Sequence, residues 1–174
     1  MAEEKVNAMS KPRLEKVTIN MGIGEPGERL DNAEELLRKL TNKKPVRTKA
    51  KKRIPTFGIR PGLPIGVKVT LRGKEGEELV KRLLSVKRGK LKARNYDNSG
   101  NVSFGIEEYI DVPGMKYDPN IGMFGFDVAL TIKKPGVRVS RRKMRRARVG
   151  KNQRVSKDEA IAFMKETFSV ETEE

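Results

Sequence analysis

Apolar and polar residues alternate along four segments of the chain, which is the period expected of strands that bury one face. The longest of these segments is residues 124–132, where every second side chain is apolar. The same alternation occurs at residues 13–21, 65–72 and 102–106. We therefore predict a sheet with one apolar face and one polar face.

Other segments place apolar residues three and four positions apart, which is the spacing of an amphipathic helix. Asp31 and Glu34 have the spacing of a capping box and predict a helix that continues to about Leu40. A second helix fits residues 75–86, and a third is predicted to follow a capping box at residues 156–159. All three helices have one apolar side that can cover the sheet.

The order of these elements predicts a single α+β domain over residues 10–170. Its sheet is expected to be mostly antiparallel, with the helices packed on one face and the other face open. Residues 1–9 and 171–174 are expected to be flexible tails. No apolar segment approaches the roughly 20 residues of a membrane helix, and the first residues do not resemble a signal peptide. A cytoplasmic protein without a membrane partner is expected.

Charge is distributed unevenly along the chain, which has 39 Lys and Arg, 23 Asp and Glu, and a net charge of +16. Residues 43–60, 81–94 and 133–157 together hold 27 of the cations and no carboxylate. The rest of the chain therefore holds all 23 carboxylates and only 12 cations. Blocks of cations on an acidic scaffold are typical of proteins that bind polyanions.

The absence of His and Cys excludes several kinds of chemistry. Histidine general bases, Cys-His triads, zinc sites of the Cys/His type and disulfides are impossible. We expect no catalytic residue, metal or cofactor. The alternative to a polyanion-binding protein is a Mg²⁺-dependent RNA-processing enzyme, in which a cluster of carboxylates would hold the metal ion. The simpler interpretation of these carboxylates is that they are solvated charges on a loop. These carboxylates are Glu107, Glu108, Asp111 and Asp118.

Gly22, Gly24 and Gly27 match the G-x-G-x-x-G motif of dinucleotide-binding turns. Glu25 places a carboxylate where a phosphate would approach, and Pro26 lacks an N–H donor. The acidic residue expected about 20 positions further on is also missing. We therefore interpret the motif as a tight turn between a strand and a helix.

Hydroxyl, amide and cationic groups occupy the polar side of two predicted strands. On the open face of a sheet, such groups can bind ribose and phosphate with little dependence on the base. The candidate RNA-binding residues on this side are Thr18, Asn20, Lys68, Thr70 and Arg72.

Two of the basic blocks are predicted to be exposed. Residues 43–60 contain several Pro and Gly, which predicts a short strand and a long loop whose cations flank Phe57. Residues 133–157 have no apolar face, so we predict a basic extension that is ordered mainly against a partner. Its candidate RNA-binding residues are Arg138, Arg141, Arg142, Arg145, Arg146 and Arg148.

Aromatic residues are sparse, which favours a structured RNA bound through its backbone over a stacked single strand. A DNA-compacting protein is a third possibility. It is disfavoured because no predicted helix has a basic recognition face.

Several strings of the sequence closely resemble the universal ribosomal protein family number five of the large subunit, which binds 5S rRNA. They are Asn-Met-Gly-Ile-Gly-Glu at residues 20–25, Lys-Pro-Val-Arg-Thr-Lys-Ala-Lys-Lys at residues 44–52, and residues 57–73. The basic extension and the ending through residues 157–160 resemble the archaeal and eukaryotic branch. The resemblance covers about residues 10–170.

This resemblance implies a non-enzymatic role in seating 5S rRNA in the central protuberance of the ribosome. Its implied partners are 5S rRNA, large-subunit rRNA, P-site tRNA, neighbouring 5S-associated ribosomal proteins and a small-subunit head protein. It implies 5S rRNA contacts at Asn20 and Thr70. Lys43, where the family usually has Gln, and Arg47 are further expected rRNA contacts. The implied tRNA-binding residues are Lys51, Lys52, Arg53, Phe57 and Arg60.

Overall fold

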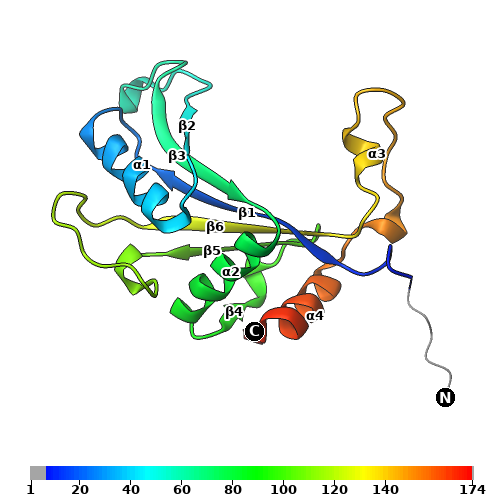
Figure 1. Cartoon of the computed structure of the whole chain (residues 1–174). Helices are drawn as coiled ribbons and strands as arrows, with labels where there is room; N and C mark the ends of the chain where they lie inside the picture. Colours follow the sequence, from blue (N-terminus) through cyan, green and yellow to red (C-terminus); the bar gives the residue numbers. More distant parts are fainter. Residues whose placement is uncertain (1–6, 174) are drawn as a thin grey trace.

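The computed structural model describes residues 7–173 and contains one antiparallel sheet of five strands (Figure 1). The strands are β1 (Arg13–Gly22), β2 (Val46–Lys49), β3 (Pro64–Leu71), β5 (Asn101–Ile106) and β6 (Phe126–Lys133). Their order across the sheet is β2-β3-β1-β6-β5, so β1 lies at the centre.

Strand alternation separates the two faces of this sheet. Val17 and Ile19 of β1 are completely buried, and they pair in register with Leu71 and Val69 of β3. The intervening residue Thr18 points to the opposite face and is only half-buried. The four long strands begin and end within two residues of the positions predicted from alternation. The predicted α+β fold with a one-sided antiparallel sheet is therefore confirmed.

The helices pack on the apolar face. They are α1 (Glu28–Thr41), α2 (Lys74–Val86) and α4 (Lys157–Phe168), whose buried side chains belong to the same core cluster as those of the strands. A further helix, α3 (Arg138–Arg141), is a single turn within the basic extension. Among the described residues, no helix combines the length and apolar character that a membrane span requires.

The predicted start of α1 is wrong. The helix begins one turn earlier, at Glu28, and Gly27 is its N-cap without any side-chain capping bond. Asp31 and Glu34 instead form ion pairs with Arg47 on β2. The second predicted capping box is confirmed, because the Ser156 hydroxyl accepts a hydrogen bond from the backbone N–H of Glu159, and the Glu159 carboxylate accepts one from the N–H of Ser156.

The expectation that residues 171–174 form a flexible tail is also wrong for residues 171–173. Glu171–Glu173 form strand β7, which pairs in parallel with β4 (Lys90–Lys92). An ion pair of 3.2 Å between Lys90 and Glu173 adds to the backbone bonds. Residues 1–6 of the other expected tail, and residue 174, lie outside the described residues.

One glycine connects the start of β5 to the end of the basic extension. Gly100 has a φ of +74°, and its carbonyl accepts a hydrogen bond from the N–H of Ile132 at 3.2 Å. A Cβ at this position would lie 2.7 Å from the Cβ of buried Val155. The extension therefore returns to the body of the protein against a backbone that accommodates only glycine.

Replacing Gly100 by alanine is expected to lower the free energy of unfolding by about 2–4 kcal/mol, because left-handed backbone strain and overpacking add together. Gly122→Ala is the matched control: its φ is +80°, but nothing lies within 4 Å of the added Cβ. The control should cost about 1–2 kcal/mol. Urea unfolding followed by circular dichroism measures both. Equal losses would show that the contact with Val155 is unimportant.

Candidate nucleic-acid interface

No helix formed by residues 7–173 packs on the polar face of the sheet. We call it the open face, and it consists of Lys16, Thr18, Asn20, Lys68, Thr70, Asn101, Ser103, Gly105, Asp127, Ala129 and Thr131. All of these residues are exposed or half-buried. Four of the predicted rRNA-binding residues, Thr18, Asn20, Lys68 and Thr70, are therefore brought together on one surface.

Cross-strand pairing fixes the positions of these four side chains. Thr18 stands opposite Thr70, with their hydroxyl oxygens 3.5 Å apart. Asn20 stands between Lys68 on β3 and Asp127 on β6. A cation, an amide and a carboxylate thus form one row across three strands. The predicted site residue Arg72 follows β3 directly and is exposed.

Sequence reasoning missed the half of the open face that lies on β5 and β6. Here the side chains are small: Ser103 stands opposite Ala129, and Gly105 stands opposite Asp127. Small residues keep this half of the sheet flat, so a polynucleotide backbone can approach the strands closely. The alternation that identified the buried residues of these strands also identified the outward ones, but those that belong to the open face include no cation and so gave no signal for binding.

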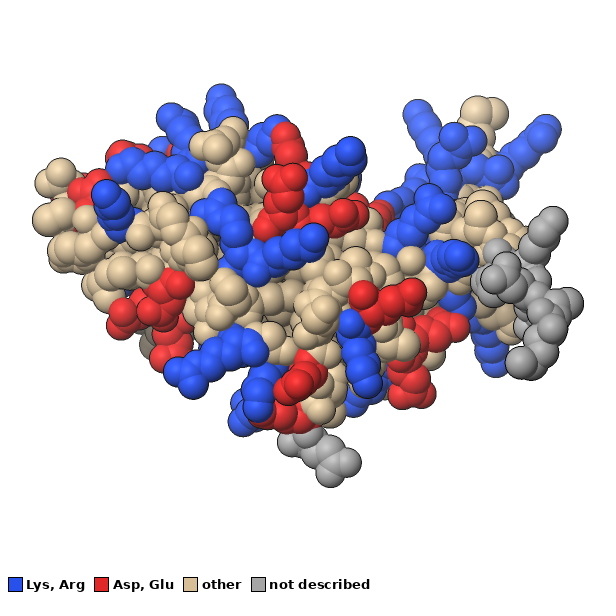
Figure 2. Space-filling view, turned by 60° about the horizontal axis from the view of Figure 1, so that its bottom comes forward, with Lys and Arg blue, Asp and Glu red and all other residues tan. Residues whose placement is uncertain are grey.

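Two basic projections extend from opposite ends of the sheet. This follows from topology, since β3 and β6 both run antiparallel to β1. The first projection precedes β3, and the second follows β6 (Figure 1). Figure 2 shows cations concentrated on the second projection, whereas acidic and basic side chains are interspersed on the rest of that view.

The first projection is the basic loop, residues 50–63. Its base is closed by backbone hydrogen bonds between Ala50 and both Gly62 and Leu63, and its tip by paired bonds between Ile54 and Ile59. The predicted tRNA-binding residues are all exposed in it: Lys51, Lys52, Arg53, Phe57 and Arg60. The Phe57 ring is 74% exposed, and none of the four cations forms an ion pair within residues 7–173.

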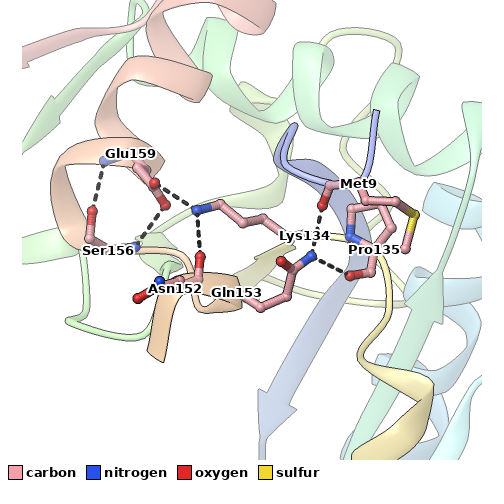
Figure 3. A network of polar contacts seen from close by, with 7 residues as sticks. All are labelled: Met9, Lys134, Pro135, Asn152, Gln153, Ser156 and Glu159. Carbon is pink, nitrogen blue, oxygen red and sulfur yellow. Dashed lines mark hydrogen bonds and ion pairs between the residues drawn. The ribbon is translucent and has the colours of Figure 1, made fainter. Parts of the chain in front are cut away.

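The second projection is the basic extension, residues 133–157. Polar contacts fix its base to α4 and to the segment before β1 (Figure 3). The Lys134 ammonium group lies 2.7 Å from a carboxylate oxygen of Glu159, and the Lys134 side chain is only 8% exposed. The carboxamide of Gln153 donates to the carbonyls of Pro135 and Met9, at 2.8 and 2.7 Å. These contacts leave the arms of the extension free to project.

Carboxylates also fix the first turn of the extension. Glu15 of β1 binds Arg141 and lies 3.3 Å from the ammonium group of Lys133. The Arg141 hydrogen bond is the main reason that the pKa of Glu15 lies below its ordinary value, although burial opposes the shift. The remaining predicted site residues of the extension are exposed. They are Arg138, Arg142, Arg145, Arg146 and Arg148.

Two predicted rRNA contacts lie away from the open face. Arg47 points toward α1, where its guanidinium binds Asp31 at 2.7 Å and Glu34 at 2.8 Å. Lys43 forms an ion pair of 2.9 Å with Glu75 of α2. Both cations therefore connect elements of the fold, and neither is presented beside Asn20 or Thr70.

The alternative chemistries find no support in the geometry. The N–H groups of Ile23 and Gly24 both donate to the carbonyl of Ile65, so the glycine turn does not direct them at a phosphate. Within residues 7–173, no three acidic side chains converge where they could hold a metal ion. Asp118 instead pairs with Lys39 at 2.9 Å.

A sheet that is open on one side and flanked by two basic projections defines a class of α+β proteins with an exposed surface suited to a polyanion. Comparison with known sequences specifies that class. Residues 7–60 match the family described as "Ribosomal protein L5", and residues 64–164 match the model of the C-terminal part of the same ribosomal family. The chain belongs to the ribosomal protein L5 family, which has a structural role in the ribosome and is not enzymatic.

Archaeal relatives named "Large ribosomal subunit protein uL5" match almost the whole chain. The relative from Sulfurisphaera tokodaii is 54% identical over 98% of this chain and 97% of its own length. That from Methanosphaera stadtmanae is 49% identical over 97% of this chain and 100% of its own length. That from Nanoarchaeum equitans is 50% identical over 94% of this chain and 96% of its own length. The resemblance seen in the sequence strings is confirmed.

The anchor of the extension should respond to acid. The pKa of Glu159 is lowered, first by its hydrogen bond to Lys134 and further by the N–H of Ser156. A lowered carboxyl pKa means that the ionised group stabilises the fold. This stabilisation is complete above the ordinary pKa and is lost as the pH falls through the lowered value.

Glu159→Gln removes the charge and keeps a residue that can complete the capping box. At about pH 6 the variant should unfold roughly 1–3 °C below the parent protein, which corresponds to about 0.5 kcal/mol, because solvent screens an ion pair whose Glu159 side chain is 42% exposed. The difference should shrink as the pH is lowered from 6 through the lowered pKa of Glu159, and disappear once the parent carboxylate is protonated as well. Thermal unfolding at several pH values measures it. A constant difference across this range would contradict the role of the charge.

Proposed function

We propose that the protein binds 5S rRNA through its open face and helps attach it to the large ribosomal subunit in the central protuberance. The observation that carries this proposal is the open face itself: among the described residues, the helices that cover the sheet, α1, α2 and α4, all lie on its other side. Polar side chains on an uncovered sheet need no protein partner for the fold, so they are available to a ligand. Membership of a ribosomal protein family supports RNA as that ligand.

The chemistry of the open face fits RNA recognised by shape. An RNA duplex presents 2′-hydroxyls and phosphates along a wide and shallow minor groove. The hydroxyls of Thr18 and Thr70 and the amide of Asn20 can exchange hydrogen bonds with ribose, while Lys68 can neutralise a phosphate. The flat surface around Ser103 and Ala129 allows close approach.

The two projections suit further RNA contacts. In the basic loop, Phe57 can pack on a sugar or base while Lys51, Lys52, Arg53 and Arg60 bind phosphates, which supports contact with P-site tRNA. The exposed arginines of the extension support binding to large-subunit rRNA. Neighbouring 5S-associated proteins and a small-subunit head protein complete the proposed set of partners of this cytoplasmic, ribosome-bound protein.

The open face can be tested with a single introduced charge. Thr70→Glu places a carboxylate against the RNA backbone and should weaken 5S rRNA binding by about 10- to 100-fold, because like charges at an interface are costly. Thr167→Glu is the matched control, because Thr167 is exposed on α4 and lies away from the open face. Binding is measured by titrating labelled 5S rRNA. Equal effects would exclude the open face as the docking surface.

Salt dependence tests how many phosphates are contacted. With roughly 6–10 phosphate contacts, affinity for 5S rRNA should fall by about 10³–10⁵ between 50 and 200 mM salt. Each phosphate-binding cation that is removed should reduce the slope of log affinity against log salt by about one. Replacing Lys68 by Gln should therefore reduce this slope, whereas Lys81→Gln on α2 should not. A slope near zero for the parent protein would contradict the proposal.

A further inference from the structure

A cavity lies where the basic extension leaves the sheet. Its volume is about 230 Å³, and it is formed by the turn before β5, the end of β6 and both arms of the extension. The volume lies below the roughly 300–1,000 Å³ typical of pockets for drug-sized ligands. It therefore suits a single planar ring system better than a larger ligand.

The cavity has apolar walls and a polar edge. Val137 and Val149 come from the two arms of the extension, and buried Val155 comes from its end. Asn98 and Ser99 contribute an amide and a hydroxyl from the turn before β5. Branched aliphatic side chains can pack against the faces of a flat ring, while amide and hydroxyl groups can hydrogen-bond to its edge.

Gln153 provides a further polar group with a fixed orientation. Its amide nitrogen already donates to the carbonyls of Pro135 and Met9 (Figure 3). The carboxamide is therefore held in place, and within residues 7–173 its oxygen has no hydrogen bond to a protein donor. A lining acceptor that is oriented before binding can select a ligand with an N–H group on its edge.

The charge around the cavity selects an anionic ligand. Three cations line it: Lys133, Lys134 and Arg154. Lys133 and Lys134 are neutralised by Glu15 and Glu159. Arg154 is exposed and forms no ion pair within the described residues, which leaves its guanidinium for a phosphate.

The cavity also adjoins the proposed RNA surface at the start of β5 and the end of β6. Lys133 lies on the same strand as the open-face residues Ala129 and Thr131, and alternation places it on the same face as they are. Ser99 lies two residues before Asn101, where β5 begins on that face. A polynucleotide on the open face would thus reach the cavity without leaving the protein surface.

From this combination we infer that the cavity binds one nucleotide extruded from folded RNA. The valines hold the two faces of the base, Asn98, Ser99 and Gln153 bind its edge, and Arg154 binds its phosphate. Extruded bases are the usual means by which proteins read RNA sequence, since the grooves of an RNA duplex hide it. The inference rests on the proposed function, because it deepens RNA binding by the same protein.

The test uses the full chain and the fluorescent nucleotide 2-aminopurine riboside 5′-monophosphate. Its fluorescence should change saturably with a dissociation constant of the order of 1 mM, as expected for a fragment-sized ligand. Ribose 5-phosphate, which lacks the base, is added as a competitor and should bind at least tenfold more weakly than the fluorescent nucleotide. Equal affinity of the two compounds, or no saturable fluorescence change, would overturn the inference.

A pair of variants locates the binding site. Ser99→Phe fills the mouth of the cavity and should reduce the affinity for the fluorescent nucleotide at least tenfold. Ser85→Phe makes the same change on an exposed position of α2 and should leave it unaltered. If Ser99→Phe disturbs folding, Asn98→Ala provides a milder change with the same expected direction. Unaltered affinity in correctly folded variants at both positions would contradict the assigned cavity.

Competition with RNA identifies the source of the nucleotide. Ribosomal RNA extracted from large subunits should displace the fluorescent nucleotide from the protein. If the RNA binds and the probe stays bound, the cavity takes free nucleotides and the inference about RNA fails. Titration of 5S rRNA against the same protein separates this failure from that of the proposed function, since binding of 5S rRNA without nucleotide binding rejects only the cavity.

Discussion

Strand alternation places the apolar side chains of β1, β3, β5 and β6 on one side of the sheet, and the rest of the structure depends on this constraint. The helices α1, α2 and α4 pack on that side because only there can they bury their own apolar residues. Nothing in the described chain is left to cover the other side. The same pattern that builds the core therefore creates the open face.

Ion pairing then divides the cations into two groups. Arg47, Lys134 and Arg141 are bound by carboxylates, and each lies at a junction between elements of the fold. The cations at the tip of the basic loop and along most of the extension have no such partner among the described residues. Paired cations connect the bases of the projections to the rest of the fold, whereas the unpaired cations are exposed to solvent. The sequence alone does not distinguish the paired cations from the unpaired ones.

Local patterns were sufficient for the four long strands and for most of the helices, since strand and helix periodicity are properties of a few consecutive residues. They failed where a distant segment decides the outcome. Asp31 and Glu34 have the spacing of a cap, but Arg47 on a neighbouring strand binds them and the helix begins at Glu28. Glu171–Glu173 carry no strand pattern and are ordered by β4.

In the candidate site, too, the positions set by local patterns could be predicted, and those set by distant segments could not. Asn20 and Thr70 could be placed on the open face because alternation fixes the direction of a side chain within a strand. The cavity at the root of the extension could not be predicted, since its walls come from segments around residues 98, 137 and 153. No local pattern relates such distant residues.

The central claim is that RNA occupies the open face and not the helical face. Chemical modification of lysines, followed by mass spectrometry, tests it directly on the protein alone and bound to 5S rRNA. Lys68 and Lys81 are both exposed cations, one on the open face and the other on α2. We predict that RNA protects Lys68 and leaves Lys81 reactive. Protection of Lys81 with Lys68 still reactive would contradict it.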